Sequence, residues 1–156
     1  MRLETLLSSI NDEMYRKITE NRTVEEAEAK ATAKVVALSA VKYGDLSNQA
    51  SKDYIFDIDR FTSFEGNTGP YILYTIVRIK SILNKYKEAG KEAGTAAILP
   101  AHSESEKALM LELTRFNAMM ENAYEETAPH KVCSYIYDLA NALNHFYHET
   151  KIMAEE

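Results

Sequence analysis

Gly66-Asn67-Thr68-Gly69-Pro70 is the strongest break in the sequence, and the fold can be worked out from it in both directions. Two glycines, an asparagine and a proline within five residues predict a turn. Pro70 suits the first position of a helix, where its missing amide proton costs nothing. Apolar side chains then follow at helical spacing: Ile72, Ile76, Ile79, Leu83 and Tyr86. A long helix is therefore expected after the turn, with Gly90 at its end.

The sequence after this helix predicts a linker and then more helices. Gly94, Pro100 and neighbouring small residues predict an exposed loop over residues 91–102. Ser103 and Glu106 form a capping-box pattern that opens a helix through Leu109, Leu113 and Phe116. Pro129 begins the last helix, whose apolar stripe is Val132, Ile136, Leu139, Leu143 and Phe146. The second half is therefore predicted to form a small bundle of three or more antiparallel helices.

The sequence before the break also predicts helices. The first has an apolar stripe of Leu3, Leu6, Leu7, Ile10, Met14 and Ile18 and closes at Asn21 and Arg22. Thr23 and Glu26 form a capping box for a second, alanine-rich helix that runs to about Tyr43, with Gly44 as its terminator. Its alanines allow a close approach to a neighbour. The alternation in residues 54–59 predicts a short strand or an extended segment.

The composition of the 156 residues predicts a mainly helical protein with a buried core. Apolar residues make up 46% of the chain, and only five glycines and three prolines occur. A formal charge of −6 argues against a broadly basic surface for duplex nucleic acid, although a local basic patch can still bind a single strand. One cysteine, Cys133, rules out an internal disulfide and a thiolate zinc cluster. The absence of a membrane-length apolar run or a signal-peptide core leads us to expect a cytoplasmic protein without membrane partners.

Two stretches of the sequence resemble the arginyl-tRNA synthetases. The first comprises residues 40–46 (AVKYGDL), 54–57 (YIFD) and 63–74 (SFEGNTGPYILY). It is similar to the run in which the class I catalytic domain of that family ends and its helical anticodon-binding domain begins. The second comprises residues 130–140 (HKVCSYIYDLA) and 144–147 (NHFY), and it resembles the helix of the family that faces the anticodon. The likeness covers nearly all of the chain, and residues 65–74 carry its most specific part.

The resemblance implies a carboxy-terminal fragment of an arginine–tRNA ligase. Residues 1–66 would be the helical tail of the catalytic domain, and residues 67–156 the DALR-type anticodon-binding bundle without its last helix. The HIGH-type and KMSK-type motifs of the family do not occur. We therefore expect a fragment that is inactive alone and holds no cofactor, while the intact parent uses ATP and magnesium to attach arginine to its tRNA. The expected partner is the arginine tRNA.

The resemblance also implies a set of tRNA-binding residues. Tyr147 takes the position of an aromatic that packs on an anticodon base, and stacking of this kind contributes roughly 1–3 kcal/mol. Since Phe146 belongs to the buried stripe, Tyr147 lies about 100° away, towards the rim of the helix; the opposing interpretation is a core tyrosine. Lys151, one turn later, and Asn144 belong to the same set. The remaining members are the turn residues Gly66, Asn67, Thr68 and Gly69, and Arg78 and Lys80 of a basic patch that includes Lys85 and Lys87. The opposing interpretations are a plain helix start for the turn and solvated surface cations for the patch and for Lys151. The turn and the last helix are expected to converge on one groove.

Other patterns favour ordinary structural roles. His145 and His148, with Glu149 adjacent, lack convincing further metal ligands. The carboxylates of Asp57 and Asp59 share a face of an extended segment by periodicity alone, and Cys133 lies in an apolar helix without a base. The alternative to RNA recognition is a helical protein-interaction domain, because a truncated bundle would expose its core and self-associate.

Overall fold

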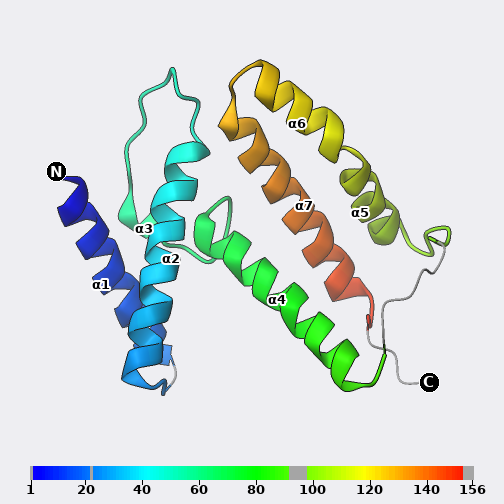
Figure 1. The fold of residues 1–156 in the computed structure, drawn as a ribbon, viewed down its shortest axis with the longest axis horizontal. Helices are drawn as coiled ribbons and strands as arrows, with labels where there is room; N and C mark the ends of the chain where they lie inside the picture. The colour runs from blue at the N-terminus through cyan, green and yellow to red at the C-terminus, as the bar shows by residue number, and fades with distance from the viewer. Residues whose placement is uncertain (1, 22, 92–97, 153–156) are drawn as a thin grey trace. The chain divides into compact units, whose positions relative to one another are not determined.

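The computed structural model describes residues 2–21, 23–91 and 98–152 (Figure 1). Within these residues the regular secondary structure is all helical, which confirms the predicted mainly helical fold. The helices are α1 (Leu3–Asn21), α2 (Glu26–Leu46), α3 (Ile58–Phe61), α4 (Gly69–Glu88), α5 (Glu104–Thr114), α6 (Phe116–Glu125) and α7 (Pro129–Glu149). The chain divides into two compact units, Met1–Leu73 and Tyr74–Glu156. Within the described residues, no helix combines the length and the hydropathy needed to cross a bilayer.

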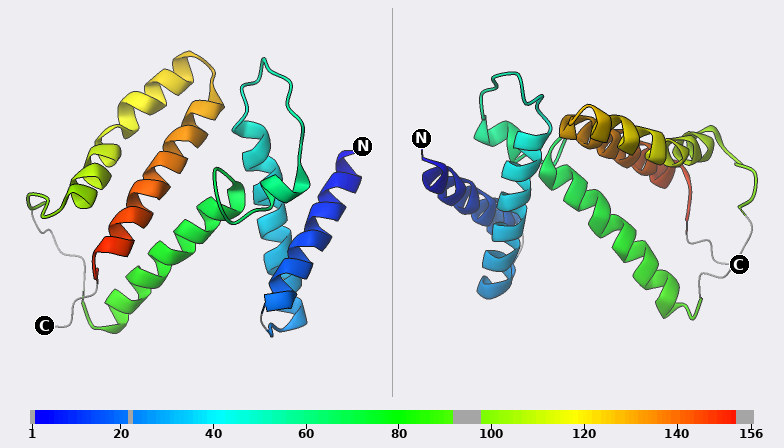
Figure 2. Two further views of the ribbon diagram at one scale, coloured as in Figure 1. Left: turned by 180° about the vertical axis from the view of Figure 1, so that it is seen from behind. Right: turned by 45° about the horizontal axis from the view of Figure 1, so that its top comes forward.

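The core of the first unit lies between α1 and α2, which run side by side (Figures 1 and 2). Ile10 and Met14 of α1 are completely buried, and they pack against Ala33, Ala37 and Ala40 of α2. The small side chains of Ala33 and Ala37 let the two helices approach closely, as predicted, whereas Ala27 and Ala31, which were expected to do the same, are exposed. Burial of this apolar surface is the main force that holds α1 on α2.

Both predicted ends of α2 are wrong. The helix begins at Glu26 with Glu25 as its N-cap and has no side-chain cap hydrogen bond, so Thr23 does not form the expected capping box. At the other end the helix continues through Gly44 to Leu46. A Cβ atom at Gly44 would lie only 2.4 Å from Cδ1 of Phe61. Gly44 is therefore present because an aromatic ring rests on the helix there, and not because the helix ends.

Residues 53–57 are irregular and form no strand, and a single helical turn, α3, follows them. Asp57 has an extended backbone conformation and its carboxylate accepts a hydrogen bond from the amide of Arg60, so it caps α3. The expectation of an extended segment therefore holds only up to Asp57. Phe61 at the end of α3 stacks on Phe56, with ring centres 4.3 Å apart.

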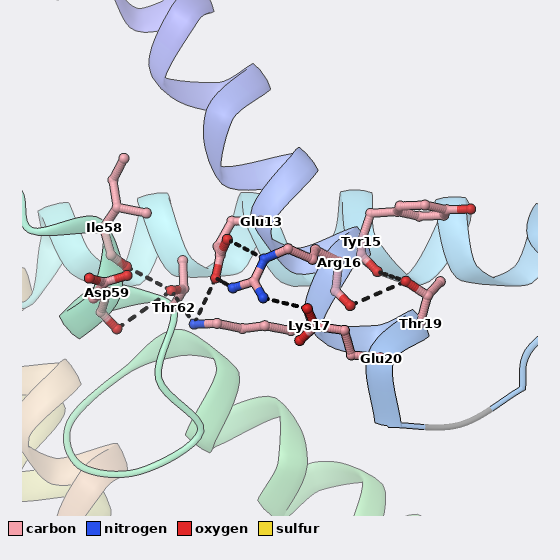
Figure 3. A network of polar contacts seen from close by, with 9 residues as sticks. All are labelled: Glu13, Tyr15, Arg16, Lys17, Thr19, Glu20, Ile58, Asp59 and Thr62. Carbon is pink, nitrogen blue, oxygen red and sulfur yellow. Dashed lines mark hydrogen bonds and ion pairs between the residues drawn. The ribbon is translucent and has the colours of Figure 1, made fainter.

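A polar network ties α1 to the segment that follows α3 (Figure 3). Nζ of Lys17 donates a hydrogen bond of 3.0 Å to Oγ1 of Thr62 and lies 3.5 Å from the carboxylate of Glu13. The Thr62 hydroxyl, which is fully buried, in turn donates to the carbonyl of Ile58. Arg16 bonds Glu13 and Glu20 on the outer side of the same helix. The network fixes the path of the chain just before the break at Gly66–Pro70.

The second unit contains α5 and α6, which lie along α7 (Figure 2). The predicted cap of α5 is confirmed, since Oγ of Ser103 accepts the amide of Glu106 while the Glu106 carboxylate accepts the amide of His102. The predicted single helix after it is interrupted at Arg115. There the hydroxyl of Tyr135 donates a 2.8 Å hydrogen bond to the carbonyl of Glu112. A side chain inserted at a helix carbonyl in this way is a usual cause of a helix break.

Two further boundaries are as predicted: α7 begins at Pro129, and α4 ends at Glu88, shortly before Gly90, whose φ is +70°. The apolar stripes of α4 and α7 are less buried than their helical spacing suggested. Ile76, Ile79 and Leu83 of α4 remain exposed, and the α7 stripe is half-buried. Of the predicted loop, residues 92–97 lie outside the described residues, and residues 98–101 are irregular.

Candidate functional site

The predicted site residues fall into one group in each unit. The turn residues Gly66, Asn67, Thr68 and Gly69 belong to the first unit, and the second unit holds Arg78, Lys80, Asn144, Tyr147 and Lys151. The expected convergence of the two groups on one groove stays a prediction.

The polar side chains of the turn make hydrogen bonds within the protein. Oδ1 of Asn67 accepts a 2.6 Å hydrogen bond from the hydroxyl of Tyr43 in α2. The Thr68 side chain is buried, donates to the carbonyl of Ser63 and accepts the amide of Tyr71. Thr68 thus caps the start of α4. The turn is consequently held in one conformation against α2.

The two glycines of the turn are favoured at their positions for different physical reasons. Gly69 is buried, and a Cβ atom there would lie 2.3 Å from the carbonyl oxygen of Ser39 and 2.9 Å from the amide nitrogen of Ala40. Only glycine lets α4 start so close to the backbone of α2. Gly66 is exposed, has open space around it and adopts a φ of +77°, which glycine tolerates best. At Gly66 the turn presents backbone alone to solvent, and the side chain of Asn67 beside it is exposed as well.

In the second unit, Arg78 lies between two tyrosine rings. Its guanidinium carbon is 4.5 Å from the centre of the Tyr147 ring on α7 and 4.9 Å from the centre of the Tyr74 ring on α4. The guanidinium also donates to the Tyr74 hydroxyl, at 3.0 Å, and to Oδ1 of Asn144. Cation–π contacts of this kind each stabilise by roughly 0.5–2 kcal/mol. Arg78, Tyr74, Asn144 and Tyr147 form what we call the Arg78 cluster.

Asn144 anchors the Arg78 cluster to the interior. Its Nδ2 donates a 3.1 Å hydrogen bond to Oγ1 of Thr75, a side chain that is almost completely buried. One amide side chain therefore joins α7 to α4 and orients the guanidinium at the same time. A planar guanidinium held on several sides loses little further entropy when it receives a ligand.

The two rings of the Arg78 cluster remain accessible. Tyr147 keeps 38% of its surface exposed and Tyr74 keeps 49%, whereas the adjacent Phe146 is half-buried in the helix interface. Tyr147 is therefore a rim residue and not a core tyrosine. Tyr74 was absent from the predicted set, although it lies four residues before Arg78 on the same helix.

The remaining cations lie outside the Arg78 cluster. On an α-helix, Lys80 is about 200° from Arg78 and Lys87 about 180°, while Lys85 returns to about 20° from it. The basic patch is thus split over two faces of α4. Lys151 is exposed, but α7 ends at Glu149 and the backbone of Thr150 is extended, so Lys151 does not continue the helical face of Tyr147.

The other candidate sites have structural explanations. Asp57 caps α3, as described above. Burial raises the pKa of the Cys133 thiol, which disfavours the reactive thiolate. His145 lies 3.5 Å from the carboxylate of Glu149 one turn later. Among the residues that the structure describes, no group of three or more His, Cys, Asp or Glu side chains is placed to hold a metal ion.

Both parts of the chain match models of known protein families. Residues 72–156 match the DALR anticodon binding domain. Residues 1–58 match the catalytic domain of the class I tRNA synthetases (R). The two matches follow the order along the chain that the resemblance in the sequence predicted.

Curated relatives are similar over the whole chain. It is 66% identical over 164 aligned residues to the arginine–tRNA ligase of Agathobacter rectalis, an alignment that covers 100% of this chain and 28% of that protein. It is 53% identical to the arginine–tRNA ligase of Alkaliphilus oremlandii, with 99% of this chain and 26% of that protein covered. The chain therefore spans about a quarter of the length of these relatives.

Solved structures give the same family. Arginyl-tRNA synthetase from Thermus thermophilus matches with a TM-score of 0.81 at 31% identity, over 100% of this chain and 25% of that one. Arginyl-tRNA synthetase from Plasmodium falciparum also gives 0.81, at 26% identity, over 99% of this chain and 28% of that one. The chain therefore belongs to the DALR anticodon-binding domain family, in the arginyl-tRNA synthetase setting that its sequence predicted.

Proposed function

We propose that the chain is the part of an arginine–tRNA ligase that recognises the anticodon arm of the arginine tRNA. The observation that carries this proposal is the Arg78 cluster, in which a guanidinium is held between two exposed tyrosine rings. The family membership supports it, because the matched domain is named for anticodon binding. The intact ligase would attach arginine to its tRNA with ATP and magnesium, held by segments that this chain lacks.

The chemistry of the Arg78 cluster suits an unpaired nucleotide. One face of the Tyr147 ring is covered by Arg78, and the exposed remainder of the ring offers a platform for a base. The guanidinium has five N–H donors, so donors beyond those bonded to Tyr74 and Asn144 can meet a phosphate or a base edge. The positive charge matters particularly here, because a chain with a net charge of −6 otherwise repels RNA.

The turn would contribute in a different way. Its side chains are used internally, so we propose that Gly66, Asn67, Thr68 and Gly69 act through the backbone at the tip of the turn. Lys80 and Lys151 are exposed, and we propose that they meet phosphates as mobile charges without adding base specificity. Lys85 is also exposed and lies on the Arg78 side of α4, so its phosphate contact would be stronger than that of Lys80.

The test is fluorescence anisotropy with a labelled anticodon stem-loop of an arginine tRNA. Tyr147→Ala should weaken binding about tenfold to a hundredfold, because a stacked base contributes roughly 1–3 kcal/mol. Tyr147→Phe should stay within about twofold of the parent, since stacking needs the ring and not the hydroxyl. Tyr124→Ala is the matched control, because Tyr124 is an even more exposed tyrosine outside the Arg78 cluster.

Two results would overturn the proposal. One is unchanged binding by the Tyr147→Ala variant while its helical content and unfolding midpoint match those of the parent. The other is equal affinity for a stem-loop with the same stem and an unrelated loop at physiological salt. Either result would leave the family membership standing and remove the recognition mechanism.

A further inference from the structure

The outer face of α6 carries a row of exposed apolar side chains. Phe116, Met120 and Tyr124 are spaced four residues apart, and they keep 51%, 40% and 86% of their surfaces exposed. Leu113, at the end of α5, is a further large apolar side chain with 56% of its surface exposed. We call these four residues the α6 stripe. Scattered exposed apolar residues are common, but a continuous row of large ones marks an interaction surface.

Most of the α6 stripe lies off the face that holds α6 on the bundle, although the ring of Phe116 also contacts Tyr135 of α7, with ring centres 6.1 Å apart. Ala123 is buried and Met119 is half-buried on the side of α6 that packs on α7. Helix geometry puts Phe116, Met120 and Tyr124 at about 20°, 60° and 100° beyond Ala123, progressively away from that contact. Figure 2 shows α6 along one side of α7. Met120 and Tyr124 therefore lie outside the core of the bundle, and Phe116 lies at its edge.

An acidic edge borders the α6 stripe on the side away from α7. Glu121 and Glu125 are exposed and lie about 60° and 100° from Tyr124 around the helix. Carboxylates in this position repel the phosphates of RNA. A second copy of the chain would bring the same acidic edge and a net charge of −6, so self-association is disfavoured as well. The charge pattern is complementary to a cationic apolar partner.

We propose that the α6 stripe is a docking surface for a basic amphipathic helix of a partner protein. Leucine-like side chains spaced three and four residues apart on that helix would pack between Phe116, Met120 and Tyr124. Lysines or arginines along one edge would face Glu121 and Glu125. The proposal is independent of RNA recognition, because the Arg78 cluster is built on α4 and α7 and shares no residue with this surface.

The first experiment measures binding of two labelled helical peptides to the whole chain by fluorescence anisotropy. Both peptides carry the same leucine stripe, and one has lysine edges where the other has glutamate edges. The lysine peptide should bind and the glutamate peptide should bind at least about tenfold more weakly. The double variant E121K/E125K should reverse this preference. The variant E65K/E88K changes the net charge equally at exposed sites elsewhere, and it should keep the original preference.

The second experiment separates the α6 stripe from other surfaces. Tyr124→Ala should weaken the lysine peptide about tenfold, as expected for loss of a large aromatic anchor, while Tyr147→Ala leaves peptide binding unchanged. A preference that E121K/E125K does not alter would overturn the proposal. So would a dimer in light scattering that Tyr124→Ala dissolves, because the occupant would then be a second copy. Loss of peptide binding in Tyr147→Ala would place the contact on the RNA site and also overturn it.

Discussion

The guanidinium carbon of Arg78 lies 4.5 Å from the centre of the Tyr147 ring, so a cation of α4 orders an aromatic side chain of α7. Tyr74 lies on the same guanidinium from its own helix, at 4.9 Å. A flat, delocalised cation can contact two rings at once, whereas a compact ammonium cannot match that geometry. The position of Tyr147 therefore depends on the shape of its neighbour as well as on its charge.

Arg78→Lys is expected to weaken RNA binding about tenfold although the charge is preserved. A lysine side chain would make neither of the flat contacts with the two tyrosine rings. It also lacks the forked N–H groups with which the guanidinium donates to Asn144 and Tyr74. Thermal unfolding should show a loss of about 1 kcal/mol, from the cation–π contacts and hydrogen bonds. Anisotropy with the anticodon stem-loop and a thermal melt measure the two effects. Equal RNA affinity for Arg78→Lys and the parent would mean that only charge matters at this position.

The salt dependence of RNA binding should distinguish the two faces of α4. Lys85 lies on the side of Arg78, whereas Lys80 lies about 200° away from it. For single strands, each phosphate contact contributes about −0.7 to the slope of log K against log salt. Lys85→Gln should therefore flatten the slope by about 0.7, and by more than Lys80→Gln does. A salt titration of both variants checks this, and a larger effect of Lys80→Gln would contradict it.

Gly69→Ala should destabilise the chain more than Gly66→Ala. At Gly69 the new methyl group would meet backbone atoms of Ser39 and Ala40 that cannot rotate away, and overpacking costs about 1–3 kcal/mol. At Gly66 there is room, and only the left-handed backbone conformation is penalised, by roughly 1 kcal/mol. Urea unfolding of the two variants gives the comparison. The opposite order would show that α4 can shift away from α2 at little cost.

Glu13 should give the first unit a stability that depends on pH. The hydrogen bond from Arg16, with the charges of Arg16 and Lys17, holds the pKa of Glu13 below its ordinary value of 4.5, although burial opposes this. A depressed pKa stabilises the folded state above pH 4.5, and this contribution is lost as the pH falls through the lowered pKa. Glu13→Gln should thus cost about 0.5–1 kcal/mol near neutral pH and little at about pH 3.

Thermal melts at both pH values measure the effect of Glu13→Gln. Asp12→Asn is the control, because Asp12 is exposed on the same helix. A Glu13→Gln deficit that persists unchanged in acid would show that packing, and not the ionised carboxylate, is responsible.

The helices could be predicted from the sequence because their periodicity and caps are local. Ser103 and Pro129 mark starts that depend on neighbouring residues alone, and both were predicted correctly. Gly44 was predicted as a terminator, but distant rings explain it, since Phe61 and Phe56 pack on the helix there. The interruption at Arg115 likewise depends on Tyr135, twenty positions later in the sequence. Boundaries that arise from tertiary contacts are not visible in a local pattern.

The candidate site was predicted only in part, because some of its contacts are tertiary and leave no local pattern. Asn144 and Tyr147 were chosen from the resemblance and Arg78 from the basic patch on its helix, and the three lie together in the second unit. Tyr74 was missed because its role depends on the side of α4 that faces α7, which spacing alone does not reveal. Lys151 was expected one turn after Tyr147 on the helix, but α7 ends at Glu149.

The turn between Ser63 and Pro70 bears on how members of this family are detected. Three residues of the turn have structural roles inside the fold. Asn67 accepts a hydrogen bond from Tyr43, Thr68 caps α4, and Gly69 allows the close approach of α4 to the backbone of α2. Selection for folding alone would preserve these residues even in a related protein that did not bind nucleic acid. A sequence match at this turn therefore reports shared architecture, and the proposed recognition of RNA has to be tested at the exposed tyrosines and the guanidinium of Arg78.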